Sequence, residues 1–329
     1  MGKTKTLLLA AIFSLGLFSD CYAIDPIISW VRLPVGFLPP IISYSTRQTG
    51  AQESNIPRAG LDSIENNFMA LMPLSTGNKS DLGAVIMYKT RIQQTDAVIP
   101  SNGIKIPEKL NNLLAGSVYK KTFDNGWTAG LAALLGSASD KLFYSKNQIV
   151  VRTDAYLKVP SNGENSWLYY IDYNNNRSFW RSYPIPGAGY WFKPAENLEA
   201  ILGLPLLYAN FCPTKNWGMN VLYIFPTQVQ SRIEYGLTPQ LTAYGAFEWG
   251  GDIFAPSDWD KPSSRLCYYE KTLEAGLHWQ FMQYSGLDIS AGYAFDRYYS
   301  EAEGFSDRQI NSVPFKNAAF FQLRAGFPF

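Results

Sequence analysis

The clearest pattern in this sequence is the alternation of apolar and polar residues at every second position. It is strongest at the end of the chain, where the apolar row is Phe321, Leu323, Ala325, Phe327 and Phe329, and Gln322, Arg324, Gly326 and Pro328 lie between. Successive side chains of a strand point to opposite faces, so this stretch predicts a strand with one apolar face. An ordinary edge strand is the alternative, although chain ends usually fray.

The same period of two continues through most of the chain, and no amphipathic helix of useful length competes with it. Counting the last strand, the pattern predicts fourteen strands, or twelve if one doubtful hairpin is left out. The others are expected at 41–48, 68–74, 82–92, 110–122, 127–135, 149–159, 167–173, 185–193, 198–206, 219–237, 241–249, 272–281 and 287–295.

The connections between these strands alternate in length. Short turns are expected near 76–80, 124–126, 160–164, 194–197, 238–240 and 284–286, and longer polar segments near 93–109, 138–147, 174–183, 207–217, 251–266 and 299–314. Short turns at one end and long loops at the other are typical of outer-membrane barrels, whereas a soluble sandwich has no reason to sort its connections. The prediction is therefore a closed antiparallel transmembrane β-barrel with short periplasmic turns and longer extracellular loops.

The N-terminal sequence predicts that the protein is exported across the inner membrane. Lys3 and Lys5 precede a mostly apolar stretch at 7–18, and Cys21-Tyr22-Ala23 offers small residues before a cleavage site after Ala23. These features indicate a signal peptide at 1–23, followed by a lead segment at 24–40 and the barrel at 41–329. A lipoprotein cysteine at Cys21 is the alternative, but Asp20 disfavours it. After residue 23 no run of eighteen apolar residues occurs, so a membrane-bound chain would have to be a barrel.

Two stretches resemble known proteins. The C-terminal row ending in Phe329 is similar to the insertion signature of bacterial outer-membrane barrels. Ala200-Ile201-Leu202-Gly203-Leu204-Pro205-Leu206-Leu207, Pro213-Thr214-Lys215-Asn216-Trp217, Phe225-Pro226 and Tyr235-Gly236-Leu237 resemble a group of uncharacterised outer-membrane barrels, a domain of unknown function. The resemblance implies a barrel in outer-membrane lipid, inserted by the barrel-insertion machinery through Phe321, Leu323, Phe327 and Phe329. It implies no substrate and no catalytic residue.

Charge narrows the range of partners. A net charge of +1 and a pI near 7.6 provide no basic excess for nucleic acid. If the apolar rows face lipid, the opposite rows line the lumen, where cations and carboxylates are nearly balanced. The lumen-lining candidates are Lys89, Arg91, Arg152, Asp154, Lys158, Arg232, Glu234, Glu248, Glu274, His278, Asp288, Asp296 and Arg324. They either tune what passes through a pore or pair and fill a narrow interior.

Catalytic chemistry is weakly represented. His278 is the only histidine, and its sequence neighbours include no serine nucleophile. No metal cluster, phosphate loop or nucleophile elbow is recognisable, so neither a cofactor nor enzymatic activity is expected. Cys212 and Cys267 are both placed at the long-loop end, where they could form a disulfide or remain two buried thiols.

These observations predict an outer-membrane pore or passive transporter for small polar solutes. A plugged barrel that acts through its surface loops, in adhesion or envelope integrity, is the alternative. An outer-membrane lipid-modifying enzyme is a third and weaker one.

Overall fold

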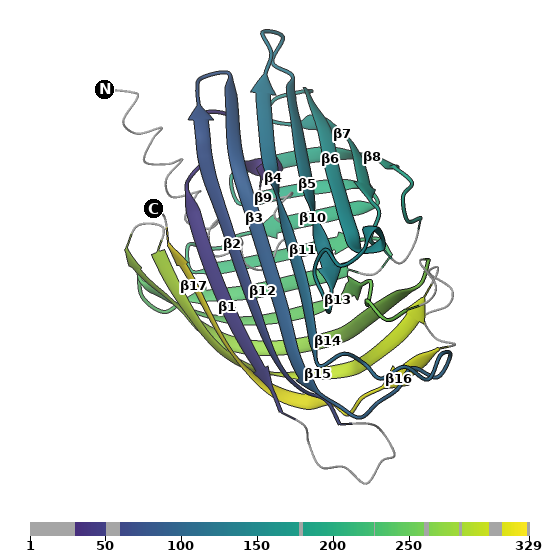
Figure 1. Ribbon diagram of the computed structural model, residues 1–329. Helices are drawn as coiled ribbons and strands as arrows, with labels where there is room; N and C mark the ends of the chain where they lie inside the picture. The colour runs from purple at the N-terminus through teal and green to yellow at the C-terminus, as the bar shows by residue number, and fades with distance from the viewer. Residues whose placement is uncertain are drawn as a thin grey trace.

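The computed structural model describes residues 30–50, 60–177, 180–226, 228–259, 263–282, 285–302 and 311–327. They form one antiparallel sheet that closes on itself (Figure 1). The strands are β1 Ile41–Thr49, β2 Asp62–Thr76, β3 Ser80–Gln94, β4 Lys109–Thr122, β5 Thr128–Ser139, β6 Ile149–Pro160, β7 Ser166–Asn174, β8 Ile185–Ala195, β9 Leu198–Leu204, β10 Leu206–Phe211, β11 Trp217–Ile224, β12 Gln228–Gly236, β13 Leu241–Phe254, β14 Arg265–Met282, β15 Ser285–Ala302, β16 Ser312–Pro314 and β17 Ala318–Phe327.

The barrel closes where the first strand meets the last. β1 pairs with β17 from Ile42 opposite Phe327 to Thr49 opposite Phe320. Elsewhere each strand pairs with the next one along the chain, except that β17 pairs with β15 and the short β16 pairs only with β15. Residues 41 and 327 therefore lie at one end, here called the terminal end. The opposite end, which carries the segments 95–108, 140–148 and 255–259, is called the loop end. The fold class predicted from the alternation is confirmed.

The predicted number of strands is wrong. The sheet has seventeen strands, of which β16 has three residues, so sixteen strands form the wall rather than fourteen or twelve. The difference arises at Pro205 and Pro226. The sequence pattern treats 198–206 as one strand and 219–237 as one bent strand. Instead, the chain reverses at both prolines, which produces the hairpins β9–β10 and β11–β12. Proline lacks a backbone donor for the ladder, so it suits a corner better than a strand interior.

Neither alternative for the two cysteines is confirmed, for the same reason. Cys212 and Cys267 are not joined, and only Cys267 is buried, since Cys212 is exposed. The expected loop 207–217 contains strand β10, so Cys212 follows that strand at the terminal end, whereas Cys267 is buried near the start of β14 at the loop end. Because the corner at Pro205 was not predicted, the residues that follow it were assigned to the opposite end of the barrel. The second missed corner, at Pro226, restores the correct assignment.

The outer surface follows the predicted rows. Phe321, Leu323 and Phe327 are exposed on the outside of β17, while Gln322 points inward; the side chain of Phe329 lies outside the described residues. An outward row of tryptophans lies at or next to the terminal ends of four strands, namely Trp127, Trp167, Trp217 and Trp279. Aromatic girdles of this kind flank the apolar band of membrane barrels. Among the described residues, no helix is long and apolar enough to cross a membrane.

The wall differs in height around the barrel. The strands β9 to β12, here called the low wall, have six to nine residues each. The strands β14, β15, β2 and β3, called the tall wall, have fifteen to eighteen. In Figure 1 the short green strands lie behind the long blue ones. The two walls enclose different interiors.

Candidate functional site: the barrel interior

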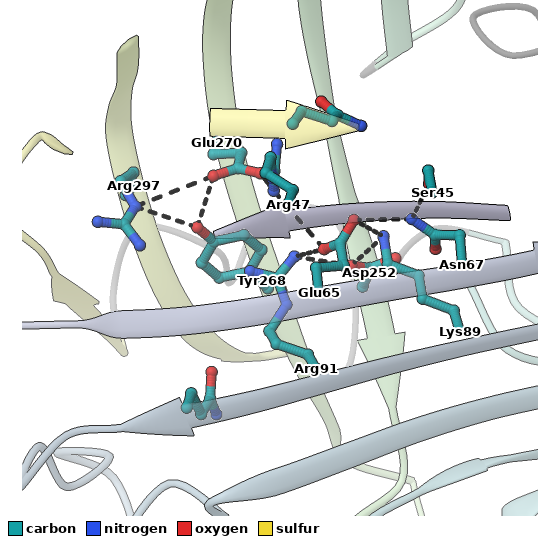
Figure 2. Close-up of polar contacts among 12 residues, drawn as sticks. Ser45, Arg47, Glu65, Asn67, Lys89, Arg91, Asp252, Tyr268, Glu270 and Arg297 are labelled. Atoms are coloured by element: carbon teal, nitrogen blue, oxygen red, sulfur yellow. Dashed lines mark hydrogen bonds and ion pairs between the residues drawn. The ribbon is translucent and has the colours of Figure 1, made fainter. Parts of the chain in front are cut away.

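A network of charged side chains crosses the interior behind the tall wall (Figure 2). Arg91 of β3 lies 2.5 Å from Glu65 of β2 and 3.1 Å from Asp252 of β13. Lys89 approaches the same carboxylates at 3.2 and 2.7 Å. Because β3 and β13 are not neighbours in the sheet, these contacts span the lumen. We call this set, with the residues described next, the central network.

The central network continues onto β1, β14 and β15. Arg47 forms ion pairs with Glu270 and, at 3.6 Å, with Glu65. The Tyr268 hydroxyl donates to Glu270 at 2.7 Å, and Arg297 Nε donates to that hydroxyl at 3.2 Å. Arg91 also lies 3.8 Å from the centre of the Tyr268 ring. Charges taken out of water are costly unless they are paired, and here each cation is matched by nearby carboxylates.

A second network lies nearer the terminal end. Arg232 pairs with Glu234 at 2.5 Å and with Asp288 at 3.4 Å, and His278 Nδ1 lies 3.2 Å from Asp288. Arg324 of β17 pairs with Glu274 of β14 at 2.8 Å, across the intervening β15. These residues are the predicted lumen-lining candidates of the second half of the chain, apart from Glu248 and Asp296. We call this set the terminal-end network.

The remaining candidates have individual positions. Arg152 pairs with Asp154 at 3.1 Å on β6, and the Lys158 ammonium lies 3.4 Å from the centre of the Trp191 ring. Glu248 is on the inward row of β13, and its electrostatic neighbours include Arg47 and Lys89. Unlike the members of the central network, Glu248 remains exposed, so this part of the interior is not fully packed.

Asp296 is the one candidate that the structure places on the wrong side. A β-bulge between β14 and β15 leaves Asp296 and Arg297 opposite a single residue, and Asp296 has a φ of +49°. The bulge shifts the alternation by one residue, because one strand gains a residue that has no partner. Asp296 therefore points outward to Lys271 at 2.7 Å, and Arg297 points inward.

The sequence pattern missed several inward residues, and the causes are specific. Arg47 alternates with Ser43 and Ser45, so the inward row of β1 was readable. Glu270 and Arg297 were missed because β14 and β15 extend beyond the predicted strands 272–281 and 287–295. Their extensions carry mixed polar and aromatic residues, which resemble loop sequence.

The segment 30–40, which precedes β1, lies inside the barrel near the terminal end and is called the inner segment. Trp30, Val31 and Leu38 are buried in one cluster with residues of the low wall and its neighbours, namely Ala132, Tyr156, Leu168, Trp191, Ile201, Leu206, Tyr208 and Leu222. Side chains from three strands hold the inner segment by polar contacts. The Lys120 ammonium donates to the carbonyls of Trp30 and Leu33, Arg32 pairs with Glu199 at 2.8 Å, and the Gly36 amide donates to Asp81 at 2.8 Å.

The loop end is narrowed by direct contact between opposite walls, here called the pinch. The Ala255 amide, just after β13, donates to the Ala138 carbonyl of β5 at 2.8 Å, although these strands are not neighbours. Next to it, Asp140 accepts hydrogen bonds from the amide and hydroxyl of Ser257, both at 2.7 Å. Burial raises the pKa of Asp140, but these hydrogen bonds outweigh it, so the pKa is lowered.

An apolar cluster extends the pinch. It includes Ile99 and Ile106, from the segment between β3 and β4, packed with Leu266, Tyr299 and Phe315. These side chains are almost completely buried. The described interior is therefore filled at the loop end, occupied by the inner segment near the terminal end, and charged between the two.

The charged interior does not have the composition of a metal centre. Within the described ranges, no group of three or more His, Cys, Asp or Glu side chains is positioned to hold a metal ion. The carboxylates of the central network instead face arginine and lysine side chains. What the arrangement can do is bind and orient a charged or polar solute that exchanges partners with these ion pairs.

Comparison with known proteins gives only distant similarities to this chain. No protein-family model and no curated protein matches it, in keeping with its resemblance to an uncharacterised family. Similar solved structures include the COG4313 outer membrane channel from Pseudomonas putida F1, at 12% identity over 90% of this chain and 97% of that chain with a TM-score of 0.38. The TodX monoaromatic hydrocarbon channel deltaS2 mutant covers 87% of this chain and 88% of its own at 9% identity and a TM-score of 0.35. Similarities this distant carry no information on ligands or activity.

Proposed function

We propose that this protein is an outer-membrane channel for small polar solutes, held shut in this conformation. Its placement in the outer membrane is supported by the closed wall, the apolar outward rows and the tryptophan girdle, since a β-sheet can cross hydrocarbon only when it is closed. The terminal end would face the periplasm and the loop end the exterior. The expected partners are outer-membrane lipid, the insertion machinery that reads the C-terminal strand, and the solutes themselves; the signal peptide predicted at 1–23 lies outside the described residues.

The central network is the observation that carries the proposal. Replacing buried ion pairs with well-packed apolar residues is often neutral or stabilising, so stability alone does not require charges in a barrel interior. Lys89 and Arg91 of β3 face Asp252 of β13 across the lumen, and beside them Arg47 pairs with Glu65 and Glu270. A solute with its own charged and polar groups could replace these contacts one at a time, which is how a pore selects without binding too tightly.

The inner segment acts as the gate in this proposal. Besides the apolar packing of Trp30, Val31 and Leu38, its polar contacts are few, of which the Lys120 ammonium makes two and Arg32 one. Release of residues 30–40 would clear the periplasmic part of the lumen. The pinch at the other end would have to open as well, by separation of Ala255 from Ala138.

Planar-bilayer recordings test the proposal. Wild-type protein is expected to show rare openings, and a Trp30→Ala, Lys120→Ala double variant much more frequent ones. Leu131→Ala, on the outer face, is the matched control and is expected to behave like the wild type. If neither the wild type nor the double variant shows current steps at any voltage while the barrel remains folded, the channel proposal fails.

A permanently plugged barrel is the second candidate, and the pinch favours it. A backbone hydrogen bond from Ala255 to Ala138 joins walls that a simple pore would keep apart. Such a barrel would act through its exterior loops, in adhesion or envelope integrity. A silent bilayer recording combined with an envelope defect in cells that lack the protein would support this function over the channel.

We infer no enzymatic role. Among the described contacts, His278 pairs with Asp288, and the Ser290 hydroxyl donates to Glu274 rather than to His278. A nucleophile needs its base within hydrogen-bond reach. Lipid hydrolysis by the purified protein that disappears in His278→Ala would overturn this inference.

A further inference from the structure

The low wall ends toward the exterior in two proline corners. β9 and β10 meet at Leu204, Pro205 and Leu206, and β11 is followed by Phe225 and Pro226. The outward side chains at these corners are apolar: Leu204 is 74% exposed and Phe225 is 54% exposed. Turns that face water usually carry polar residues, so the composition of these corners needs another explanation.

The small height of the low wall explains why its corners are apolar. A strand rises about 3.3 Å per residue and tilts by roughly 35–45° in a membrane barrel, so the seven residues of β9 reach only about 18 Å above the terminal end. The apolar band of such barrels is about 25 Å tall. If the terminal end is level around the barrel, the corners at Pro205 and Pro226 lie within hydrocarbon rather than above it.

The backbone at the corners is arranged as hydrocarbon requires. Pro205 has no N–H group, and its carbonyl accepts a hydrogen bond from the Phe225 amide at 2.8 Å. The Leu206 amide donates to the Tyr170 hydroxyl at 3.1 Å. Turns in water can leave such groups to the solvent, whereas groups in lipid must be satisfied within the protein. The bond from Phe225 to Pro205 joins the two corners, and the bond from Leu206 to Tyr170 ties the first corner to β7, which suits apolar surroundings.

The interior immediately behind β9, β10 and β11 is apolar as well, whereas β12 contributes Arg232 and Glu234 to the terminal-end network. Ile201, Leu206 and Leu222 are buried on the inner face of the low wall, in the cluster that also holds Trp30 and Leu38 of the inner segment. Behind the tall wall, at the level of the central network, the inward residues are charged instead. The apolar interior and the apolar rim thus lie on the same side of the barrel.

We propose that the low wall is a lateral entrance, through which a single-chain amphiphile such as a fatty acid passes from the outer leaflet into the barrel. Its acyl chain would cross the rim at Leu204 and Phe225 and then occupy the surface of Leu206 and Leu222, displacing Trp30. The pinch closes the axial route at the exterior end, which leaves the side as the way in. This inference depends on placement in the membrane but not on ion conduction.

Photo-crosslinking tests the entrance directly. The full chain is reconstituted in vesicles with a dodecanoic acid that carries a diazirine at its chain end, and the labelled residues are mapped by mass spectrometry. Inward residues Leu206 and Leu222 are expected to be labelled together with outward Leu202 and Val221. The matched control is β5, where outward Leu131 should be labelled and inward Leu134 should not.

The result separates the alternatives. Labelling of outward residues alone, on both sides of the barrel, would overturn the entrance. A phospholipid with the same diazirine chain is expected to label only outward positions; inward labelling by it as well would overturn the assignment to single-chain amphiphiles. Bilayer conductance is not part of the readout, so a barrel that never conducts could still pass this test.

Spin-label depth measurement provides a second, independent reading. With Cys212 replaced by serine, and with Cys267 completely buried, Leu204→Cys and Phe225→Cys are each labelled with a nitroxide. Relaxation by oxygen is expected to dominate over relaxation by a water-soluble nickel complex at both positions, as at Leu131→Cys. Tyr144→Cys, in an exposed segment of the loop end, should show the reverse. Corners that behave like Tyr144→Cys would refute the lateral entrance.

Discussion

The tall wall and the low wall belong to one sheet, but they differ in strand length and in the chemistry of the interior that they enclose. Behind the tall wall, strands of fifteen to eighteen residues enclose the charged central network. Behind the low wall, strands of six to nine residues enclose an apolar cluster and the inner segment. The comparison shows that the interior chemistry differs around this barrel. The central network lies behind the long strands, with Arg47 of the nine-residue β1 as a member, whereas β9, β10 and β11 bury apolar residues against the inner segment.

The difference has an energetic basis. On the tall side the inward side chains satisfy one another by ion pairs, so each depends on partners that come from distant strands. On the low side the inward side chains need only close packing, which the inner segment completes. Substitutions on the two sides should therefore lower the free energy of unfolding for different reasons and by different amounts.

Arg91→Ala is expected to have the largest effect. It removes the cation between Glu65 and Asp252 and should lower the free energy of unfolding by about 3–5 kcal/mol, as breaking a buried pair typically does. Urea unfolding in lipid vesicles measures the loss. Arg91→Lys, which retains the charge, is the control and should recover part of it. A loss below about 1 kcal/mol would mean that water already solvates this network.

Leu222→Ala tests the low wall by the same measurement. It leaves a cavity in the cluster that holds Trp30 and should cost about 2–4 kcal/mol. Val221→Ala, on the outward face of the same strand, is the matched control; lipid can fill the space it leaves, so a much smaller loss is expected. Equal effects for the two variants would mean that the inner segment does not pack on this wall.

Substitutions at Asp296 test the bulge in β15, which turns Asp296 outward and Arg297 inward. The Asp296 φ of +49° is unfavourable for a β-branched residue, so Asp296→Val should lower the unfolding free energy by about 1–3 kcal/mol. Asp296→Gly should be nearly neutral, because glycine adopts this conformation at little cost and the exposed pair with Lys271 contributes little. Similar losses for both variants would assign the effect to the ion pair instead of the backbone.

The smallest effect is expected at the pinch, where the two sides meet. Because the pKa of Asp140 is lowered in the folded protein, its carboxylate stabilises the fold above the ordinary pKa of aspartate, near 3.9. This contribution is lost as the pH falls through the lowered value. The difference in stability between wild type and Asp140→Asn should therefore shrink from about pH 6 to pH 3. A constant difference over this range would contradict the role of Asp140.

The order of amino acids is enough to specify the fold class and most of the inward rows. Alternation with a period of two specifies which residues of a strand share a face, so Arg152, Asp154 and Arg324 could be assigned inward from their positions in the chain. Alternating connection lengths indicated closure of the sheet. Both properties are local, and local patterns can be read along one chain.

Three-dimensional packing determines what depends on partners distant in sequence. Only the pairing of β9 with β10 and of β11 with β12 shows that Pro205 and Pro226 are corners, and only the partner strand β14 shows the bulge that turns Asp296 outward. The pairing of Arg91 with Asp252 and the docking of the inner segment likewise join residues far apart in the chain. No local periodicity encodes such contacts, because they are selected by the shape and charge of the closed interior as a whole.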